Sequence, residues 1–403
     1  MPHVVVAGAG IIGLATAAEL LPRGWAVTVC DPAPASGASH AAAGMLAPAA
    51  EMVWGQNALY PLMIASGRMY PDFLARLGHA DGDAADLGHV RNGTLVVGAD
   101  AADRAALADL TAIQRAAGLP VETATTRQLR RLEPALSPAI SGGVLLPEDH
   151  HVDPRRLTAA LLRHLEAHPR AELIRRGVSA LTGTTTDAGR ATDGVVLSDG
   201  RRLAADQVVL ATGLAARELA DLPLRPIHGD ILRLKLPASN HPLITRTVRA
   251  LVNGRPVYAV PRGDGIVLGA SSREDSGAGV RTESVHELLD SAHRILPGVL
   301  DSTLEEATAR ARPGTPDDVP LIGRRDPGLV VSTGYSRHGI LLAPLGARLT
   351  ADLVAGSPPP STGHDDAAGP SLLPLTAEAN VAALLAAVAP DRFPATVTAR
   401  STP

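Results

Sequence analysis

The sequence VVVAGAGIIG, residues 4–13, decides the fold of this protein. A run of β-branched residues leads into the pattern G-x-G-x-x-G, formed by Gly8, Gly10 and Gly13, and a run with helical spacing follows it. The first glycine allows a tight turn, the second lets the backbone approach a pyrophosphate, and the third lets helix and strand pack closely. The stretch therefore predicts the strand–turn–helix unit that opens a dinucleotide-binding domain.

The next residues extend this unit to a second strand. We expect a strand at His3 to Ala7, a helix at Ile11 to Leu21 and a strand at Ala26 to Cys30, a spacing typical of this motif. Asp31 closes the second strand, where an acidic side chain binds a ribose 2′-hydroxyl. The partial positive charge at the start of the helix suits a diphosphate. FAD or NAD is therefore favoured over NADP, with an ordinary glycine-rich turn as the alternative interpretation.

Beyond this unit, the apolar pattern predicts a parallel βαβ core interrupted twice by a mixed sheet. Residues 32–50 have small side chains and are typical of a loop close to a ligand, and Asp153 with Pro154 is typical of a helix start. From Ser357 the sequence resembles a linker with one apolar helical patch at Val381 to Val388. Further helices are predicted at Asn57 to Leu77, Ala101 to Gly118, Arg155 to His168, Glu283 to Leu296 and Ile340 to Val354. Further strands are predicted at Gly93 to Gly98, Glu172 to Leu181, Gly194 to Leu197, Gln207 to Ala211, Gly229 to Leu236, Val257 to Val260, Gly265 to Gly269 and Leu329 to Ser332.

The composition excludes several classes of function. With 403 residues, 45% of them hydrophobic, the chain can bury the cores of two domains and is not intrinsically disordered. A formal net charge of −4 and an aromatic content of 2% give no footprint for nucleic acid. The single cysteine, Cys30, excludes an internal disulfide and a multi-cysteine metal site. The uncharged run Val4 to Ala18 is too short to span a membrane and has no basic segment before it, so we expect a cytoplasmic protein without a membrane partner.

Four ordered motifs resemble a known flavoprotein family. They are GASHAAAGMLAP at residues 37–48, QVVLATG at 207–213, RPGTPDDVPLIG at 312–323 and STGYSRHGILLAP at 332–344. Together they resemble the D-amino-acid-oxidase-type FAD-dependent oxidoreductases. The last two motifs, with AAAGM of the first, are similar to the glycine oxidase branch that serves thiamine biosynthesis.

The resemblance implies an α/β architecture in two parts. The first is a Rossmann-like FAD-binding domain with a glutathione-reductase-type parallel sheet, and the second is a discontinuous α+β substrate domain on a mixed or antiparallel sheet. The expected FAD-binding ranges are 1–86, 141–227 and 311–356. The expected substrate-binding ranges are 87–140 and 228–310, and a linker with a short helix is expected at 357–403.

The resemblance also implies noncovalent FAD, because the carboxy-terminal region where some relatives attach flavin through cysteine has none here. Residues 37–45 would lie beside the flavin, and Gly339 to Leu342 would open the final helix with its positive end toward the flavin ring. The expected cofactor-binding residues are Gly8, Gly10, Ile11, Ile12, Gly13, Asp31, Pro32, Ser39, Ala42, Ala43, Gly44, Met45, Val178, Ala211, Thr212, Gly213, Arg312, Arg337, His338, Gly339, Ile340 and Leu341.

Three side chains are expected around the substrate. Arg312 in RPGTP matches the family arginine that holds the amino-acid carboxylate, which a guanidinium binds through two parallel hydrogen bonds. Tyr258 in YAVPR matches a tyrosine that reaches the same carboxylate, and Arg337 in GYSRHG matches another pocket position. The alternatives are a surface charge for either arginine and a core position for the tyrosine. The family histidine two residues before the tyrosine is replaced by Pro256, so the pocket wall differs.

We therefore expect FAD-dependent oxidation of glycine or another small amino acid or amine. The products would be a keto acid (glyoxylate from glycine), ammonia and hydrogen peroxide, with molecular oxygen as the acceptor. The alternatives are a D-amino-acid dehydrogenase that passes electrons to a quinone and a non-catalytic nucleotide-binding protein. No metal site is expected, because His150 and His151 lack further ligands at useful spacing and Asp153 fits a helix cap. The preferred substrate and homo-oligomerisation stay open.

Overall fold

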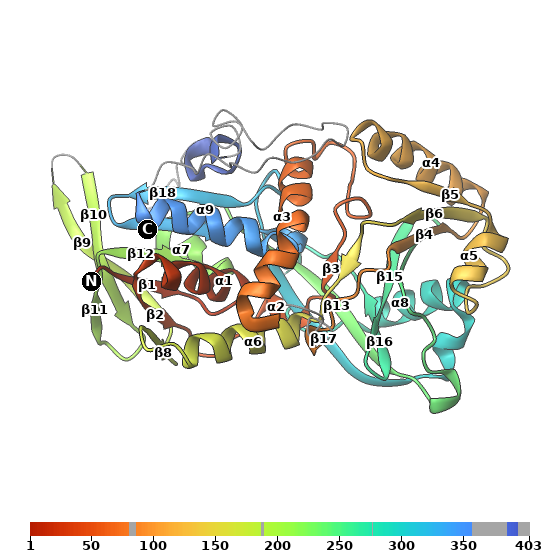
Figure 1. Ribbon diagram of the computed structural model, residues 1–403, viewed down its shortest axis with the longest axis horizontal. Coiled ribbons are helices and arrows are strands. Elements are labelled where there is room, and N and C mark those ends of the chain that lie inside the picture. The colour runs from red at the N-terminus through yellow and green to blue at the C-terminus, as the bar shows by residue number, and fades with distance from the viewer. Residues whose placement is uncertain (80–85, 187–188, 276, 357–384, 394–403) are drawn as a thin grey trace, which may run out of the picture.

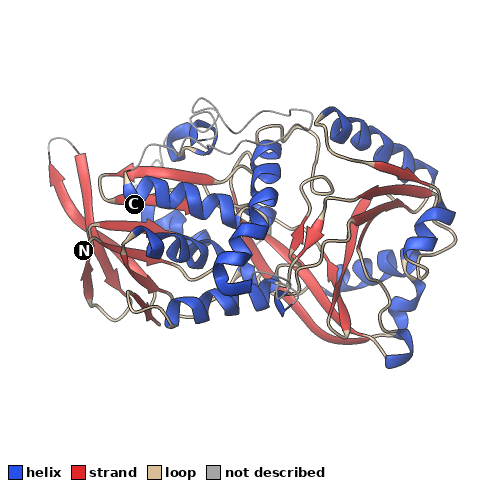
Figure 2. Ribbon diagram, in the orientation of Figure 1, coloured by secondary structure: helices blue, strands red, loops and turns tan. Residues whose placement is uncertain are grey.

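A computed structural model describes residues 1–79, 86–186, 189–275, 277–356 and 385–393. Two large sheets lie at opposite ends of an elongated molecule, with helices packed against both (Figures 1 and 2). None of the helices in these ranges has both the length and the apolar character that a bilayer crossing requires.

The six-stranded sheet contains the amino-terminal strand β1 and is parallel except at one edge. Along β1, Val4 and Val6 pack into one hydrophobic cluster while Val5 and Ala7 pack into another. Both faces of the strand are therefore buried, which explains its continuous apolar sequence. Strand β18 pairs antiparallel to β19 at the edge, and the other pairs are parallel. The strand order is β18 (Leu321–Asp326), β19 (Leu329–Thr333), β12 (Gln207–Leu210), β1 (His3–Ala7), β2 (Ala26–Cys30) and β8 (Ala171–Ile174).

Helices cover one face of this sheet, and a small antiparallel sheet covers the other. The helices on the first face are α1 (Ile11–Leu20), α3 (Leu59–Leu74), α6 (Pro154–Glu166) and α9 (Ala343–Ala355). The small sheet has the order β11 (Arg202–Ala204), β10 (Gly189–Leu197) and β9 (Val178–Thr186), and helix α7 (Ala216–Ala220) lies beside it. The parallel sheet is thus enclosed on both sides, as buried parallel strands require.

The eight-stranded sheet is mixed, because β4 and β14 are parallel while its other pairs are antiparallel. Its order is β17 (Thr303–Gly314), β13 (Arg225–Lys235), β16 (Gly265–Gly269), β15 (Arg255–Arg262), β14 (Thr247–Val252), β4 (Thr94–Gly98), β6 (Gly142–Leu146) and β5 (Glu122–Ala124). Helices α4 (Ala101–Ala116), α5 (Thr126–Leu132) and α8 (Thr282–Ile295) pack against it. The short strands β3 (Met45–Leu46) and β7 (His150–His151) pair with each other, and the short helix α2 (Ala38–Ala41) contacts both β17 and α6.

The predicted α/β fold, with a parallel sheet and a second mixed sheet, is confirmed, and three local expectations were wrong. The single strand expected at Glu172 to Leu181 is two strands in different sheets, because the chain turns at residues 175–177. The loop expected at 32–50 contains α2 and β3. The final helix begins at Ala343, one turn later than expected, and Pro344 suits such a first turn because it lacks an N–H donor. The linker expected after Ser357 and most of the expected helical patch lie outside the described residues. The part of the patch that is described, residues 385–388, is helical.

Candidate active site

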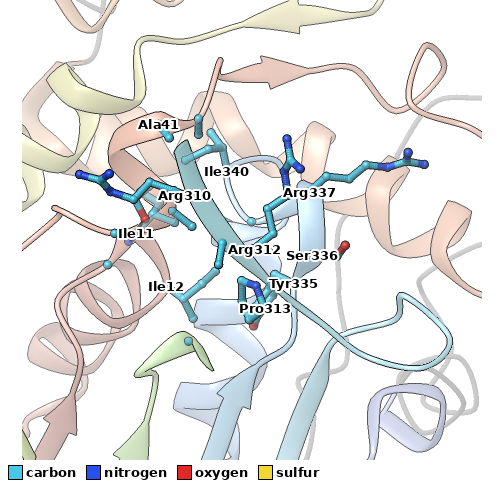
Figure 3. Close-up of a pocket in the computed structure, with 18 of the residues that line it drawn as sticks. Ile11, Ile12, Ala41, Arg310, Arg312, Pro313, Tyr335, Ser336, Arg337 and Ile340 are labelled. Carbon is cyan, nitrogen blue, oxygen red and sulfur yellow. Dashed lines mark hydrogen bonds between the residues drawn. The ribbon is translucent and has the colours of Figure 1, made fainter. Parts of the chain in front are cut away.

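A cavity of about 700 Å³ lies between the two large sheets. It begins at the carboxyl ends of β1 and β2 and reaches β13, β15 and β17; Figure 3 shows part of its lining. Open parallel sheets bind ligands at this edge, and the volume is that of an ordinary ligand site. Of the predicted site residues, those lining the cavity are Gly8, Gly10, Ile11, Ile12, Asp31, Pro32, Ser39, Ala42, Ala43, Gly44, Met45, Val178, Ala211, Thr212, Gly213, Tyr258, Arg312, Arg337, His338, Gly339, Ile340 and Leu341.

The glycine-rich turn brings backbone amides to the cavity. Gly8 has a φ of +101°, and a Cβ there would lie 2.4 Å from the carbonyl oxygen of Ala211. A Cβ at Gly13 would lie 1.9 Å from the carbonyl oxygen of Gly8. Gly13 does not line the cavity. Its lack of a side chain lets α1 pack against the turn.

Asp31 connects strand β2 to the glycine-rich turn. One carboxylate oxygen, Oδ2, accepts a hydrogen bond from the Ala9 N–H at 2.7 Å, and Oδ1 accepts one from the Ala33 N–H at 2.8 Å. A carboxylate has further lone pairs, so it can also accept a hydrogen bond from a ribose hydroxyl. The structure thus adds a supporting role to the expected ribose contact.

Residues 37–45 cross between the two sheets and are anchored by a side chain of the mixed sheet. Gly44 has a φ of +81°, and a Cβ there would lie 2.0 Å from the carbonyl oxygen of Val152. The guanidinium of Arg262 on β15 donates to the carbonyl oxygen of Ala43 and, at 2.7 Å, to that of Val152. Burial lowers the pKa of Arg262 to about 10, so it stays protonated at neutral pH. The segment is therefore held close to the cavity by its backbone.

The residues at this end of the cavity fit FAD. Helix α1 begins after Gly10 with no side chain of its N-cap residue bound to it and no acidic residue in its first turn, so its first-turn amides other than that of Ile11 are available to a diphosphate. The neighbouring Ser39 Oγ accepts from the Ile11 N–H at 3.0 Å, which fixes the loop opposite the helix start. Cys30 is buried and its pKa is raised to about 12, chiefly by burial, so its thiol is not reactive toward a flavin.

Arg312 and Tyr258 come from different strands of the mixed sheet to the other end of the cavity. The Arg312 guanidinium occupies the space beside Gly229, where a Cβ would lie 2.2 Å from Nη2. A Cβ at Gly269 would lie 2.5 Å from the Tyr258 hydroxyl. Two neighbouring strands therefore carry glycine where these side chains need room, and both side chains line the cavity.

Their protonation states suit the binding of a carboxylate. Burial raises the pKa of Tyr258, although Arg312 and Arg249 oppose the shift, so the phenol is a neutral hydrogen-bond donor at neutral pH. Burial lowers the pKa of Arg312, and Tyr258 opposes that shift. One guanidinium Nη1 of Arg312 approaches the Ser271 carbonyl oxygen at 3.4 Å, which leaves its other donors for a ligand.

Arg337 lines the cavity from a short helical turn, Ser336–His338, that follows β19. Its side chain is 40% exposed, so it lies nearer the solvent than Arg312 (Figure 3). Its Nε donates to His338 Nε2 at 3.2 Å. His338 is buried, and burial, with Arg337, Arg249 and Arg312 nearby, lowers its pKa, so the ring is neutral at neutral pH. The His338 Nδ1 lies 3.6 Å from Glu51 Oε2 without forming a hydrogen bond.

Sequence reasoning missed Glu51, Arg249 and Asp149. Glu51 and Arg249 form an ion pair at the cavity wall, and Arg249 lies directly opposite Tyr258 on the neighbouring strand. The buried Asp149 carboxylate accepts from the Ala49 and Ala50 N–H groups at 3.1 and 2.8 Å, which holds the loop that presents Glu51. None of the three belongs to a sequence motif. Only the alternation of side chains along β14, which puts Arg249 and Leu251 on the same face, could have suggested that Arg249 points toward the cavity.

The expected helix cap at Asp153 is confirmed. Its carboxylate accepts from the Arg155 N–H at 2.9 Å and the Arg156 N–H at 3.3 Å. Within the described ranges, His, Cys, Asp and Glu side chains form no group of three or more that could hold a metal ion. Gly339 to Leu342 form a turn rather than the helix start, and the Leu342 N–H donates to the His338 carbonyl oxygen at 2.8 Å.

A glycine-rich turn on a parallel sheet, joined by one cavity to an arginine and a tyrosine on a mixed sheet, defines a dinucleotide-dependent oxidoreductase. Comparison with known proteins makes this more specific. The chain belongs to the DAO family of FAD dependent oxidoreductases, which matches residues 3–353. The family resemblance and the FAD cofactor predicted from the sequence are thereby confirmed.

Two named relatives and one solved structure are similar to this chain over most of its length. A bifunctional protein ThiO/ThiG of Synechocystis is 34% identical over 361 residues, which are 87% of this chain and 51% of that protein. The chain thus spans about half the length of these bifunctional relatives. A protein of Rhizobium etli whose name gives it as a thiamine biosynthesis oxidoreductase, ThiO, is 32% identical, over 85% of this chain and 93% of that protein. The crystal structure of glycine oxidase from Geobacillus kaustophilus superposes with a TM-score of 0.80 at 28% identity, covering 98% of this chain and all of that one.

Proposed function

We propose that this protein is an FAD-dependent oxidase of glycine and other small amino acids or amines, acting in thiamine biosynthesis. The single observation that carries the proposal is that Arg312 and Tyr258, from the mixed sheet, line the same cavity as Asp31 and the glycine-rich turn of the parallel sheet. The names of the relatives from Rhizobium etli and Geobacillus kaustophilus support the same activity and pathway.

The chain's own residues account for binding and orientation. Arg312 binds the substrate carboxylate through two parallel hydrogen bonds, and the neutral Tyr258 hydroxyl donates a third. This fixes the carbon that bears the amine relative to the cofactor, and such positioning supplies most of the rate enhancement. Bound FAD would supply the hydride acceptor for that carbon and the two-electron route to oxygen, which would be reduced to hydrogen peroxide. Water then converts the imine product to a keto acid and ammonia. For glycine the acid is glyoxylate.

The cavity also favours the neutral form of the substrate amine. Arg249, Arg312 and Arg337 all line this end, and like charges lower the pKa of an ammonium group. Only the neutral amine has the lone pair that assists loss of hydride. Because the amine then binds without its extra proton, no residue in the described part of the site has to act as a general base.

We further propose the organisation of the protein around this site. The FAD-binding part is assigned to residues 1–86, 141–227 and 311–356, and the substrate-binding part to 87–140 and 228–310. Strand β6 pairs with β4 and β5 in the mixed sheet, so we propose that the second FAD-binding range begins at residue 147 rather than at 141. Noncovalent FAD, molecular oxygen as acceptor and a cytoplasmic location belong to the same proposal, and the oligomeric state stays open.

Peroxide release by the purified holoenzyme tests the proposal. Glycine, sarcosine, D-alanine and D-proline are supplied in turn in air-saturated buffer. The proposal expects peroxide and keto acid in equal amounts from at least one of them. Reduction of the flavin without peroxide, followed by electron transfer to an added quinone, would instead identify a dehydrogenase. The absence of any flavin reduction would overturn the proposal.

A further inference from the structure

The substrate end of the cavity contains more positive than negative charge. Arg249, Arg312 and Arg337 all line it, whereas Glu51 is the only carboxylate among the described residues that line this end. Burial lowers the pKa of Arg249 to about 10, so it remains protonated at neutral pH. The neutral Tyr258 hydroxyl adds no charge. The site therefore has two positive charges in excess before a substrate binds.

Carboxylates just outside the cavity compensate this excess only in part. Asp230 opposes the fall in the pKa of Arg312, and Asp318 opposes the fall in the pKa of Arg337. Asp230 Oδ1 lies 3.1 Å from Arg273 Nη2, and the two groups form a buried ion pair. Asp318 Oδ1 lies 3.7 Å from Arg225 Nη2, and Asp318 Oδ2 accepts a hydrogen bond from the Gln56 side chain at 2.9 Å. Both acids are thus drawn toward arginines outside the cavity, although Arg225 also pairs with Glu274 and Arg273 also pairs with Asp275. A substrate with one carboxylate would still leave part of the positive charge unbalanced in a partly buried site, which is unfavourable.

Arg249 is placed to bind a second anionic group next to the first. It lies opposite Tyr258 on the antiparallel strand β14, and opposed residues on one face have their Cβ atoms roughly 5 Å apart. Tyr258 in turn neighbours Arg312, whose charge opposes the rise of the Tyr258 pKa. The tyrosine therefore separates two guanidinium groups along the cavity wall.

Glu51 does not neutralise both of its cationic neighbours. It pairs with Arg249, while its Oε2 lies 4.0 Å from Arg337 Nε. One carboxylate is thus shared between two guanidinium groups. A ligand carboxylate can use the Arg249 donors that Glu51 leaves free, since a guanidinium has five N–H donors.

We propose that Arg249 is a second carboxylate-binding residue and that the site prefers imino diacids, amines with a carboxymethyl group on each side of the nitrogen, over glycine or sarcosine. This inference rests on the proposed oxidase function. For iminodiacetate, a C–H bond next to nitrogen is broken, its electron pair passes through FAD to oxygen, and water adds to the imine. One iminodiacetic acid, one oxygen and one water yield one glyoxylic acid, one glycine and one hydrogen peroxide.

Equilibrium binding of two ethers to the holoenzyme tests the role of Arg249 without turnover. Oxydiacetate has two carboxylates and methoxyacetate has one, and neither has a nitrogen to oxidise. Both are titrated while the flavin absorbance is recorded. We expect oxydiacetate to bind the wild type at least about tenfold more tightly, as one additional charge-assisted contact implies. Equal affinity of the wild type for the two ethers would overturn the inference.

Two variants test the residue itself. Arg249→Met should abolish the preference for oxydiacetate and leave methoxyacetate binding nearly unchanged. Glu51→Gln should strengthen the preference, because it removes the carboxylate that competes for the Arg249 donors. Arg255→Met is the matched control, because Arg255 is exposed on the same strand as Tyr258 and pairs with Glu287. An unchanged preference in Arg249→Met with bound flavin would overturn the assignment, and Glu51→Gln provides the test if Arg249→Met does not fold.

Turnover separates failure of this inference from failure of the proposed function. The inference predicts a kcat/KM for iminodiacetate at least about tenfold above that for sarcosine. Peroxide from sarcosine and glycine but not from iminodiacetate would overturn the inference and leave the oxidase function intact. Tight binding of oxydiacetate without peroxide from any of the three amines would overturn the oxidase function and keep Arg249 as an anion-binding residue.

Discussion

A single methyl group added at Gly229 tests the position of Arg312 without removing a charge. In Gly229→Ala, the new Cβ would lie 2.2 Å from Arg312 Nη2 and 2.4 Å from Cζ and Nη1. Nonbonded heavy atoms rest about 3.5–4.0 Å apart, so the guanidinium must retreat by about 1 Å or more. A pair of hydrogen bonds to a carboxylate does not survive such a shift. Because a charge-assisted contact is worth about 1.5–3 kcal/mol, kcat/KM for glycine should fall roughly 10- to 100-fold.

The assay is peroxide release under steady-state conditions, with flavin absorbance as the check that the variant retains its cofactor. The displaced atoms belong to the end of a flexible side chain, so the fold should persist. Gly279→Ala is the matched control, because no atom lies within 4 Å of its added Cβ. Wild-type kcat/KM in Gly229→Ala would show that Arg312 does not bind the substrate carboxylate from this position.

Three further predictions concern the cofactor and the buried acid. Asp31→Ala should weaken FAD binding by about 1–3 kcal/mol in fluorescence titrations of the apoprotein. The KM of the loaded enzyme should stay unchanged, because Asp31 follows β2 of the parallel sheet whereas Arg312 lies on β17 of the mixed sheet. Equal FAD affinity would limit Asp31 to its contacts with Ala9 and Ala33. Acid or heat should release intact FAD, since the buried Cys30 thiol has a pKa of about 12, and flavin retained on the denatured chain would contradict noncovalent binding. Burial raises the pKa of Asp149 to about 7 from an ordinary value near 4, so the folded state favours the protonated acid, and its ionisation reduces stability as pH rises from about 4 to 7. The wild type should therefore lose free energy of unfolding relative to Asp149→Asn as pH rises over this range, by at most about 4 kcal/mol in urea titrations. A difference between the two proteins that does not change with pH would contradict the raised pKa.

The cofactor end of the molecule could be predicted closely because its constraints are local. Gly13 is required by a contact of 1.9 Å with the Gly8 carbonyl oxygen inside one strand–turn–helix unit, and such a contact leaves a pattern in adjacent residues. The contact that requires Gly8 is with Ala211 at the end of β12, but the tight turn that Gly8 forms is itself local. The strands His3–Ala7 and Ala26–Cys30 were predicted to the residue because both faces of the sheet are buried and the apolar runs have clear ends. Here the short-range sequence determines the structure.

The substrate end could be predicted only in part because its contacts join distant segments. Arg249 and Tyr258 meet through strand register, and Glu51 reaches them from a loop held by Asp149, about 100 residues further along the chain. No short pattern encodes such pairings, and at this end the family resemblance covers Tyr258, Arg312 and Arg337 but neither Arg249 nor Glu51. The late start of α9 has a similar cause, since the turn before Ala343 is fixed by packing in the core rather than by helix propensity.

The most direct test of the central claim is the kcat/KM of Arg312→Lys for glycine, measured by peroxide release with FAD bound. Lysine keeps the positive charge and loses the second parallel hydrogen bond, so we predict a loss of at least about 2 kcal/mol, or some thirtyfold, nearly as large as that of Arg312→Ala. A simple amine without a carboxylate should be affected far less by either change. Wild-type efficiency toward glycine in both variants would contradict the claim that Arg312 anchors the substrate.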